Sequence, residues 1–81
     1  MNKLRQDFNI GKNLRDLRLK CKLTQEQVAA KLQVLGCDTT RTVYSRYETG
    51  ELNIRIRDLV ALKKIFNCKY DDFFAGLSIE E

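Results

Sequence analysis

The start of a helix at residues 23–28 is the feature that most constrains the fold of this chain. Thr24 offers a side-chain oxygen to the first free N–H groups of a helix, and Gln27 can bond back to the Thr24 backbone. Leu23 and Val28 flank this pair at the spacing of a hydrophobic staple. The buried stripe expected on this helix has four members: Val28, Ala29, Leu32 and Leu35. The pattern predicts a helix that begins after Thr24 and ends at Gly36.

Four further segments carry a helical pattern. The first is expected over residues 9–21, with a narrow apolar stripe of Ile10, Leu14, Leu17 and Cys21. The next lies at about residues 40–49, where Asp38, Thr39 and Thr40 are alternative caps and Gly50 follows the end. A helix from Ile56 would bury Leu59, Leu62 and Phe66 and end at Asn67, and a last one would cover residues 70–77. No segment alternates apolar and polar residues, so an all-α fold of five helices is predicted.

The 81 residues are enough for one domain with a modest core, and 43% hydrophobic and 32% charged residues are typical of a folded protein. No apolar run approaches the roughly 20 residues that span a bilayer. The first residues lack the apolar segment of a signal peptide, so we expect a cytoplasmic protein and no membrane contact.

Positive charge is concentrated in one part of the chain. The net charge is +4, but residues 1–57 hold 12 Lys and Arg against 6 Asp and Glu, whereas residues 58–81 hold 3 against 5. A surface that faces phosphates requires such a bias. Solvated helix faces would give the same numbers, so charge alone leaves both interpretations open.

The chain lacks the groups that most enzymes and metal sites need. Histidine is absent, and Cys21, Cys37 and Cys68 are too far apart in sequence to form a Cys-x-x-Cys pair. We therefore expect no metal, no cofactor and no enzymatic activity. Cys21 and Cys68 are interpreted as small core residues and Cys37 as a thiol in a loop.

The segment at 40–49 has two distinct faces. At helical spacing, Tyr44 and Tyr47 share one face, with Val43 beside them. The opposite arc is polar and basic and contains Arg41, Thr42, Ser45 and Arg46. Such a helix would bury its aromatic side and present guanidinium and hydroxyl groups to a partner.

Three blocks of the chain, in order, resemble the Cro/repressor-type (XRE-like) helix-turn-helix transcriptional regulators. The blocks are Ile-Gly-Lys-Asn-Leu-Arg-Asp-Leu-Arg at 10–18, Leu-Thr-Gln-Glu-Gln-Val-Ala-Ala-Lys-Leu at 23–32 and Tyr-Ser-Arg-Tyr-Glu-Thr-Gly at 44–50. The resemblance covers roughly residues 10–74. It implies a five-helix lambda-repressor-like domain over residues 9–78, between an N-terminal arm (1–8) and a short tail (79–81).

The resemblance also implies roles for individual residues. The third helix would enter the major groove of double-stranded DNA. Its base-reading positions would be Arg41, Thr42, Arg46 and Val43, and the DNA backbone would be met by Gln25, Thr40, Ser45 and Thr49. The alternative for each is a solvated side chain or, for Thr40, a plain helix cap. Arg18 and Glu48 match a structural salt bridge between the first and third helices.

The chain departs from the family pattern between the second and third helices. Residues 33–38, Gln-Val-Leu-Gly-Cys-Asp, make this connection about five residues longer than the common short turn. We expect the second helix to gain a turn before the chain reverses at Gly36. The angle between the two helices, and hence the bases that Arg41 and Arg46 reach, need not follow the family standard.

The resemblance predicts a bacterial or phage regulator associated with the nucleoid, acting as a repressor and as a homodimer on an inverted-repeat operator. Phe73, Phe74 and Leu77 would form the two-fold contact, unless they only close the core of the single chain. The alternative function is a protein-interaction module, an antitoxin or adaptor, on the same fold. Salt-dependent binding to duplex DNA separates the two.

Overall fold

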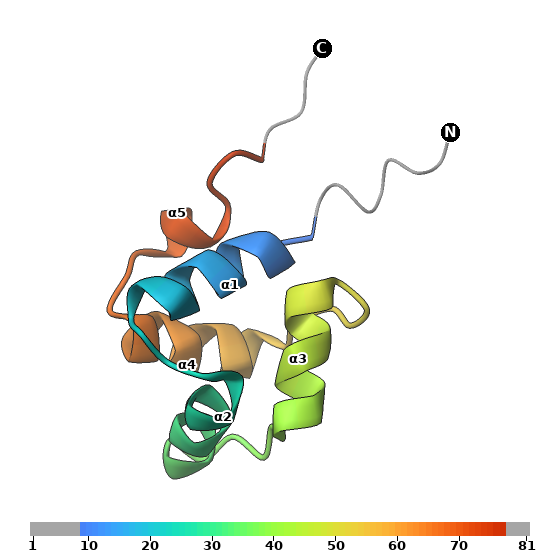
Figure 1. The fold of residues 1–81 in the computed structure, drawn as a ribbon, viewed down its shortest axis with the longest axis vertical. Coiled ribbons are helices and arrows are strands. Elements are labelled where there is room, and N and C mark those ends of the chain that lie inside the picture. The colour runs from blue at the N-terminus through green and yellow to red at the C-terminus, as the bar shows by residue number, and fades with distance from the viewer. Residues whose placement is uncertain (1–8, 78–81) are drawn as a thin grey trace.

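The computed structural model describes residues 9–77, which form five helices and no strand (Figure 1). The helices are α1 (Gly11–Lys20), α2 (Gln25–Val34), α3 (Arg41–Thr49), α4 (Ile56–Phe66) and α5 (Tyr70–Phe73). The predicted all-α architecture is confirmed, and the helix boundaries of α1 to α4 lie within two residues of those expected. The arm at 1–8, residue 78 and the tail at 79–81 lie outside the described residues.

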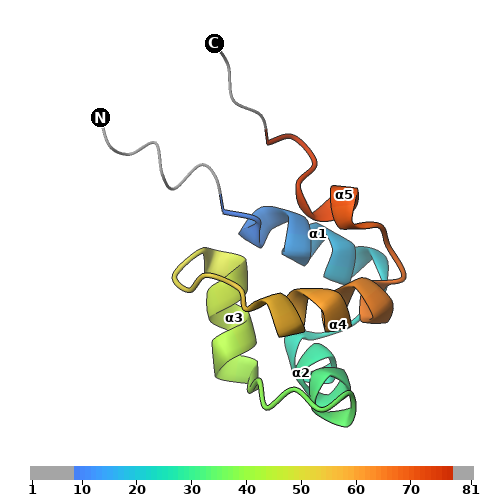
Figure 2. The same ribbon diagram turned by 180° about the vertical axis from the view of Figure 1, so that it is seen from behind.

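The helices surround a single hydrophobic core. α1 contacts both α3 and α5, while α2 contacts α3 and α4. Figures 1 and 2 show α1 and α4 one above the other, with α3 standing across their ends and α2 on the far side of α4 from α1. One side of α3 therefore packs against α1 and α2.

The core takes at least one buried side chain from each helix. Leu14, Leu32, Leu62 and Phe73 from α1, α2, α4 and α5 have no exposed surface, and neither does Tyr44 from α3. The predicted aromatic face of α3 points inward, where the Tyr44 and Tyr47 rings meet edge to face with centroids 6.4 Å apart. Burial of one face fixes which residues of α3 face outward.

α2 begins at the predicted cap and ends at the predicted glycine. The Gln27 N–H donates to Thr24 Oγ1 at 3.0 Å and the Thr24 N–H donates to Gln27 Oε1 at 2.8 Å, which completes the capping box. At the other end Gly36 has φ +91°, and the N–H of Cys37 donates to the carbonyl of Leu32 at 2.9 Å. This is a Schellman turn, which folds the residue after the glycine back onto the helix.

Two predictions about burial in this turn are wrong. Cys37 lies in the connection between α2 and α3, as predicted, but it is a core residue with 3% exposure because the turn packs it against the last part of α2. Leu35 does not continue the buried stripe, since it is the C-cap residue and remains 43% exposed. Cys21 and Cys68 are half-buried against the core.

The prediction of a helix over residues 70–77 is wrong beyond Phe73. The Asn13 side-chain amide donates to the carbonyls of Phe73 (2.8 Å) and Ala75 (2.9 Å). The Phe73 carbonyl, which a longer helix would bond to Leu77, therefore bonds to α1 instead. Gly76, at φ +81°, then turns the chain away.

Candidate nucleic-acid interface

α3 is held by a cap at each end. Thr40 Oγ1 accepts a hydrogen bond of 3.2 Å from the backbone N–H of Val43, so Thr40 is the N-cap among the three alternatives. Gly50 ends the helix at φ +84°, a conformation that glycine adopts without steric cost. The caps fix nine residues, two and a half turns, as one rigid element.

The outward face of α3 carries the side chains singled out from the sequence. Arg41, Thr42 and Arg46 are exposed, whereas Ser45 and Val43 are half-buried at the edges of this face. Two guanidinium groups and a hydroxyl thus project from one side of a capped helix. Such groups can donate to the acceptors on base edges and to phosphate oxygens.

The surface beside α3 is shallowly hollowed where α1 ends and α2 begins. Lys22, Gln25, Glu26 and Arg41 are among the residues that line this depression. Gln25 and Arg41, which the sequence analysis placed at the DNA backbone and at the bases, therefore border the same concave surface. Free N–H groups at the start of α2 add a positive partial charge there.

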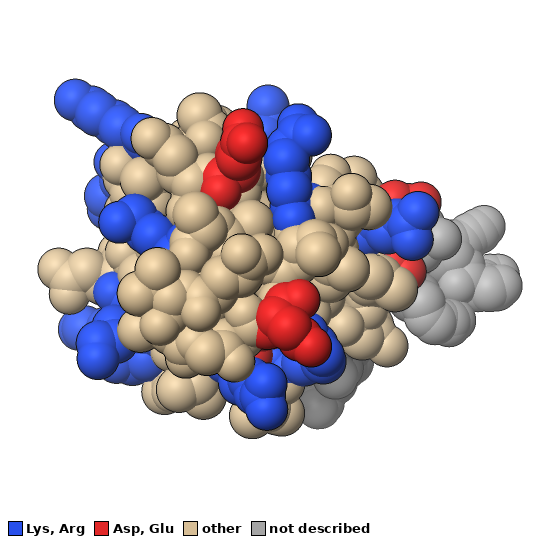
Figure 3. Space-filling model, turned by 90° about the horizontal axis from the view of Figure 1, so that it is seen from below, with Lys and Arg blue, Asp and Glu red and all other residues tan. Residues whose placement is uncertain are grey.

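Figure 3 shows the charge on the face viewed from below in Figure 1. Lys and Arg side chains stand out around the rim of this face, and Asp and Glu occupy smaller areas between them. On this face the positive charge is therefore distributed around the rim and not gathered in one patch. Arg41 and Arg46 differ from the other basic residues by their position on the outward face of α3 and not by a higher local density of positive charge.

An ion pair joins α1 to α3 below this surface. Arg18 Nε donates to Glu48 Oε2 at 2.7 Å and Arg18 Nη2 donates to Glu48 Oε1 at 3.2 Å, with side chains only 11% and 5% exposed. Gln25 Nε2 donates to the same carboxylate at 2.9 Å. Glu48 therefore joins the first three helices. The salt bridge predicted between Arg18 and Glu48 is present, whereas no sequence pattern indicated the hydrogen bond from Gln25.

The surroundings of Glu48 keep it charged. Burial by itself would raise the pKa of its carboxyl, but hydrogen bonds from Arg18 and Gln25 and the Arg18 charge hold that pKa below the ordinary value of 4.5. Burial likewise raises the pKa of Tyr44, whose hydroxyl is buried and meets no hydrogen-bond partner among the described residues. Both groups keep one protonation state across the physiological range.

The lowered pKa predicts acid sensitivity. Because the carboxyl of Glu48 titrates lower in the folded chain than in the unfolded one, it stabilises the fold above its unfolded pKa, and this stability is lost as the pH falls through its folded pKa. We expect the free energy of unfolding by urea to decrease between about pH 6 and about pH 3. Glu48→Gln should show a smaller decrease than the parent chain. An equal pH dependence in the two proteins would contradict the prediction.

Two structural residues were missed by the sequence analysis. Gly11, in the first turn of α1, faces the backbone of α3: a Cβ added there would lie 2.2 Å from the carbonyl oxygen of Glu48. Asp58, in the first turn of α4, is fully buried and accepts hydrogen bonds from around α3. The only sequence signal for Gly11 is a glycine within a helix, where alanine would be favoured. Asp58 looks like an ordinary acidic residue near a helix start.

Of the three residues proposed for a two-fold contact, one does not reach the surface of the chain. Phe73 has no exposed surface and belongs to the core of the single chain, so its assignment to an interface is wrong. Phe74 is 48% exposed and Leu77 is half-buried. Phe74 and the exposed Leu52 line one groove of about 180 Å³.

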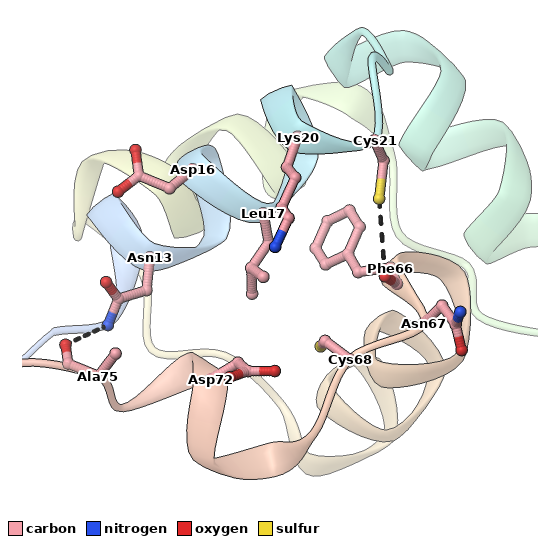
Figure 4. A pocket seen from close by; sticks show the side chains of 10 residues that line it. All are labelled: Asn13, Asp16, Leu17, Lys20, Cys21, Phe66, Asn67, Cys68, Asp72 and Ala75. Atoms are coloured by element: carbon pink, nitrogen blue, oxygen red, sulfur yellow. Dashed lines mark hydrogen bonds between the residues drawn. The ribbon is translucent and has the colours of Figure 1, made fainter.

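A separate cavity of about 570 Å³ lies between α1, the end of α4 and α5 (Figure 4). Leu17 and Phe66 form its apolar wall, and Cys21 Sγ donates to the Phe66 carbonyl at 3.6 Å. Its charged members, Asp16, Lys20 and Asp72, are exposed and of mixed sign. The cavity therefore has no set of buried polar groups that would define a ligand.

Within residues 9–77, no three His, Cys, Asp or Glu side chains are grouped as a metal site would require. None of the helices in that part of the chain has the length and apolarity to cross a bilayer.

A capped α2 that leads into an α3 with outward arginines and hydroxyls, on a five-helix core, defines a DNA-binding helix-turn-helix domain. The comparison with protein families agrees, since the Helix-turn-helix family (HTH_3) matches residues 14–73. The chain belongs to this family, which is the Cro/repressor (XRE-like) type, and is a DNA-binding regulator of that class. The same comparisons match it to no curated protein and to no solved structure.

Proposed function

We propose that this protein is a sequence-specific repressor of transcription that reads the major groove of double-stranded DNA with α3. The observation that carries the proposal is the division of α3 into a buried aromatic face and an exposed face with Arg41, Thr42 and Arg46. A bound domain would repress by covering its operator.

The base-reading set has members of three chemical kinds. Arg41 and Arg46 can each donate two hydrogen bonds to O6 and N7 of a guanine. Thr42 can offer its hydroxyl to a base or its methyl group to thymine. Val43, half-buried at the edge of the face, would add an apolar contact with a thymine methyl.

The backbone-contacting set lies around these residues. It comprises Gln25, Thr40, Ser45 and Thr49. The Thr40 oxygen already accepts from the cap N–H, but its hydroxyl hydrogen remains able to donate to a phosphate. The Thr49 hydroxyl lies 3.2 Å from the Arg46 carbonyl and 2.9 Å from the Glu51 carboxylate, so a phosphate would compete with these local partners.

We further propose that two copies bind an inverted-repeat operator. One α3 reads only a few base pairs, and a second half-site multiplies the specificity. The exposed Phe74 is retained as the two-fold contact together with Leu77, whose backbone N–H donates to the Phe74 carbonyl at 3.0 Å. Phe73, the neighbour of Phe74 in the sequence, lies in the core.

Selection of binding sites from random duplexes, followed by fluorescence anisotropy over a salt series, tests this function. A DNA reader should enrich one motif, and its log affinity should fall with log salt concentration by about 0.9 per phosphate neutralised. An inverted repeat among the selected sites would support two bound copies. No enrichment and no salt dependence would overturn the proposal in favour of a protein-interaction module.

Arg41→Ala should weaken binding to the selected operator by about 1–3 kcal/mol, roughly 5- to 150-fold, because a base pair loses a bidentate partner. Binding to random duplex should weaken much less. Lys22→Gln is the matched control: this lysine lines the same depression but belongs to the turn before α2, so both affinities should fall alike. Equal losses on both DNAs for Arg41→Ala would remove Arg41 from the base-reading set.

A further inference from the structure

Asp58 is a buried carboxylate on the first turn of α4, and its side chain is fully enclosed. An ionised carboxylate in the interior destabilises a fold unless hydrogen bonds and a counter-charge compensate it. Four polar contacts do so here. Thr39 Oγ1 lies 2.8 Å from both carboxylate oxygens, the Tyr47 hydroxyl donates to Oδ2, and Arg55 Nε donates to Oδ2 at 3.4 Å.

The donors bracket α3. Thr39 directly precedes Thr40, the N-cap of α3, whereas Tyr47 lies in the last turn of that helix. Arg55 lies in the connection that follows α3, and its Nη2 also donates to Thr39 Oγ1 at 3.1 Å and to Asp38 Oδ1 at 3.2 Å. One carboxylate on α4 thus holds the segment before α3, the helix itself and the segment after it.

These contacts fix the start of α3, which the lengthened connection between α2 and α3 leaves undefined. Residues 35–40 separate α2 from α3, and a connection of six residues does not by itself define where the next helix starts. Thr39 is nevertheless fully buried, and its hydroxyl bonds to Asp58. The Glu48 ion pair acts near the other end of α3, far along the helix from Arg41.

We propose that the Asp58–Thr39 contact positions the first turn of α3 for reading DNA, so that Asp58 and Thr39 are specificity-determining positioning residues that touch no base. The proposal rests on the function assigned to α3 above. Arg41 and Thr42 follow Thr39 by two and three residues, so a shift of Thr39 moves both of them. A bidentate pair with guanine tolerates little displacement, and random DNA makes no such demand.

The test compares Thr39→Val with Thr39→Ser. Valine keeps the shape of threonine but cannot donate to Asp58, whereas serine keeps the hydroxyl. The specificity ratio, operator affinity over random-duplex affinity, is measured by anisotropy where circular dichroism shows each variant fully folded. We expect Thr39→Val to lower this ratio by about 2- to 30-fold and Thr39→Ser to restore most of it.

Two further variants separate positioning from general stability. Leu62→Val changes the core face of α4 outside this cluster, and it should lower the melting temperature without changing the specificity ratio. Thr39→Ala removes the same hydroxyl and replaces Thr39→Val if that variant does not fold. Amide hydrogen exchange gives a readout without DNA: Thr39→Val should speed exchange in the first turns of α3 more than in α1.

The outcomes are distinguishable. If the parent chain itself does not prefer its selected operator over random DNA, the proposed function has failed. If the parent discriminates and folded Thr39→Val or Thr39→Ala keeps the same ratio, the positioning role is overturned. A loss of specificity in Leu62→Val as large as in Thr39→Val would also overturn it, because stability alone would then explain the effect.

Discussion

Glu48→Ala is expected to lower the free energy of unfolding by about 3–5 kcal/mol, because it leaves the Arg18 guanidinium charged, enclosed and without its partner. The amide of Gln25 loses its acceptor in the same step. A domain of this size has a total stability of the order of 5–15 kcal/mol, so the variant should be unfolded in part at 37 °C. Urea denaturation followed by circular dichroism measures the loss.

Asp16→Ala is the matched control for this experiment. The Lys12–Asp16 pair has a comparable distance of 2.8 Å, but its side chains are 84% and 56% exposed. Water already screens such a pair, so its removal should cost less than about 1 kcal/mol. If Glu48→Ala and Asp16→Ala lower the free energy of unfolding by the same amount, burial does not make the Arg18–Glu48 pair more stabilising than an exposed pair.

Gly11→Ala is expected to destabilise the protein, in the opposite direction to helix propensity. Alanine within a helix is normally favoured over glycine by roughly 0.5–1 kcal/mol. Here the new Cβ would lie 2.2 Å from the Glu48 carbonyl oxygen and 2.7 Å from its carbon, both of them backbone atoms that no rotamer change can move. α1 and α3 must separate, and overpacking of this kind costs about 1–3 kcal/mol.

Arg15→Ala on the exposed side of α1 provides the comparison, and it should change the stability by less than about 0.5 kcal/mol. The sign of the change in stability for Gly11→Ala shows whether the contact with α3 outweighs the higher helix propensity of alanine. A variant with a higher melting temperature than the parent chain would show that α1 and α3 are not in close backbone contact.

The sequence predicted the elements whose causes are local. Thr24 and Gln27 specify the start of α2 by contacts within four residues, and the two tyrosines assign the inner face of α3 by helical period alone. The same period identified Arg41, Thr42 and Arg46 as outward residues, as the structure has them.

What could not be predicted depends on contacts between distant segments. The end of α5 is set by Asn13, about sixty residues earlier, which takes the Phe73 carbonyl that a longer helix would use. The need for glycine at position 11 appears only when α3 lies against it. Asp58 gains its role from Thr39 and Tyr47, which no periodicity connects to it.

The division of α3 into two faces has an evolutionary consequence. Tyr44 and Tyr47 are buried in the core and Glu48 forms the ion pair with Arg18. The side chains at positions 41, 42 and 46 are exposed and lie outside the core. Selection can therefore exchange the outward residues for others without endangering the scaffold. Under the proposed function, a lineage carrying this domain would acquire new target genes by a few substitutions, while every copy continues to fold in the same way.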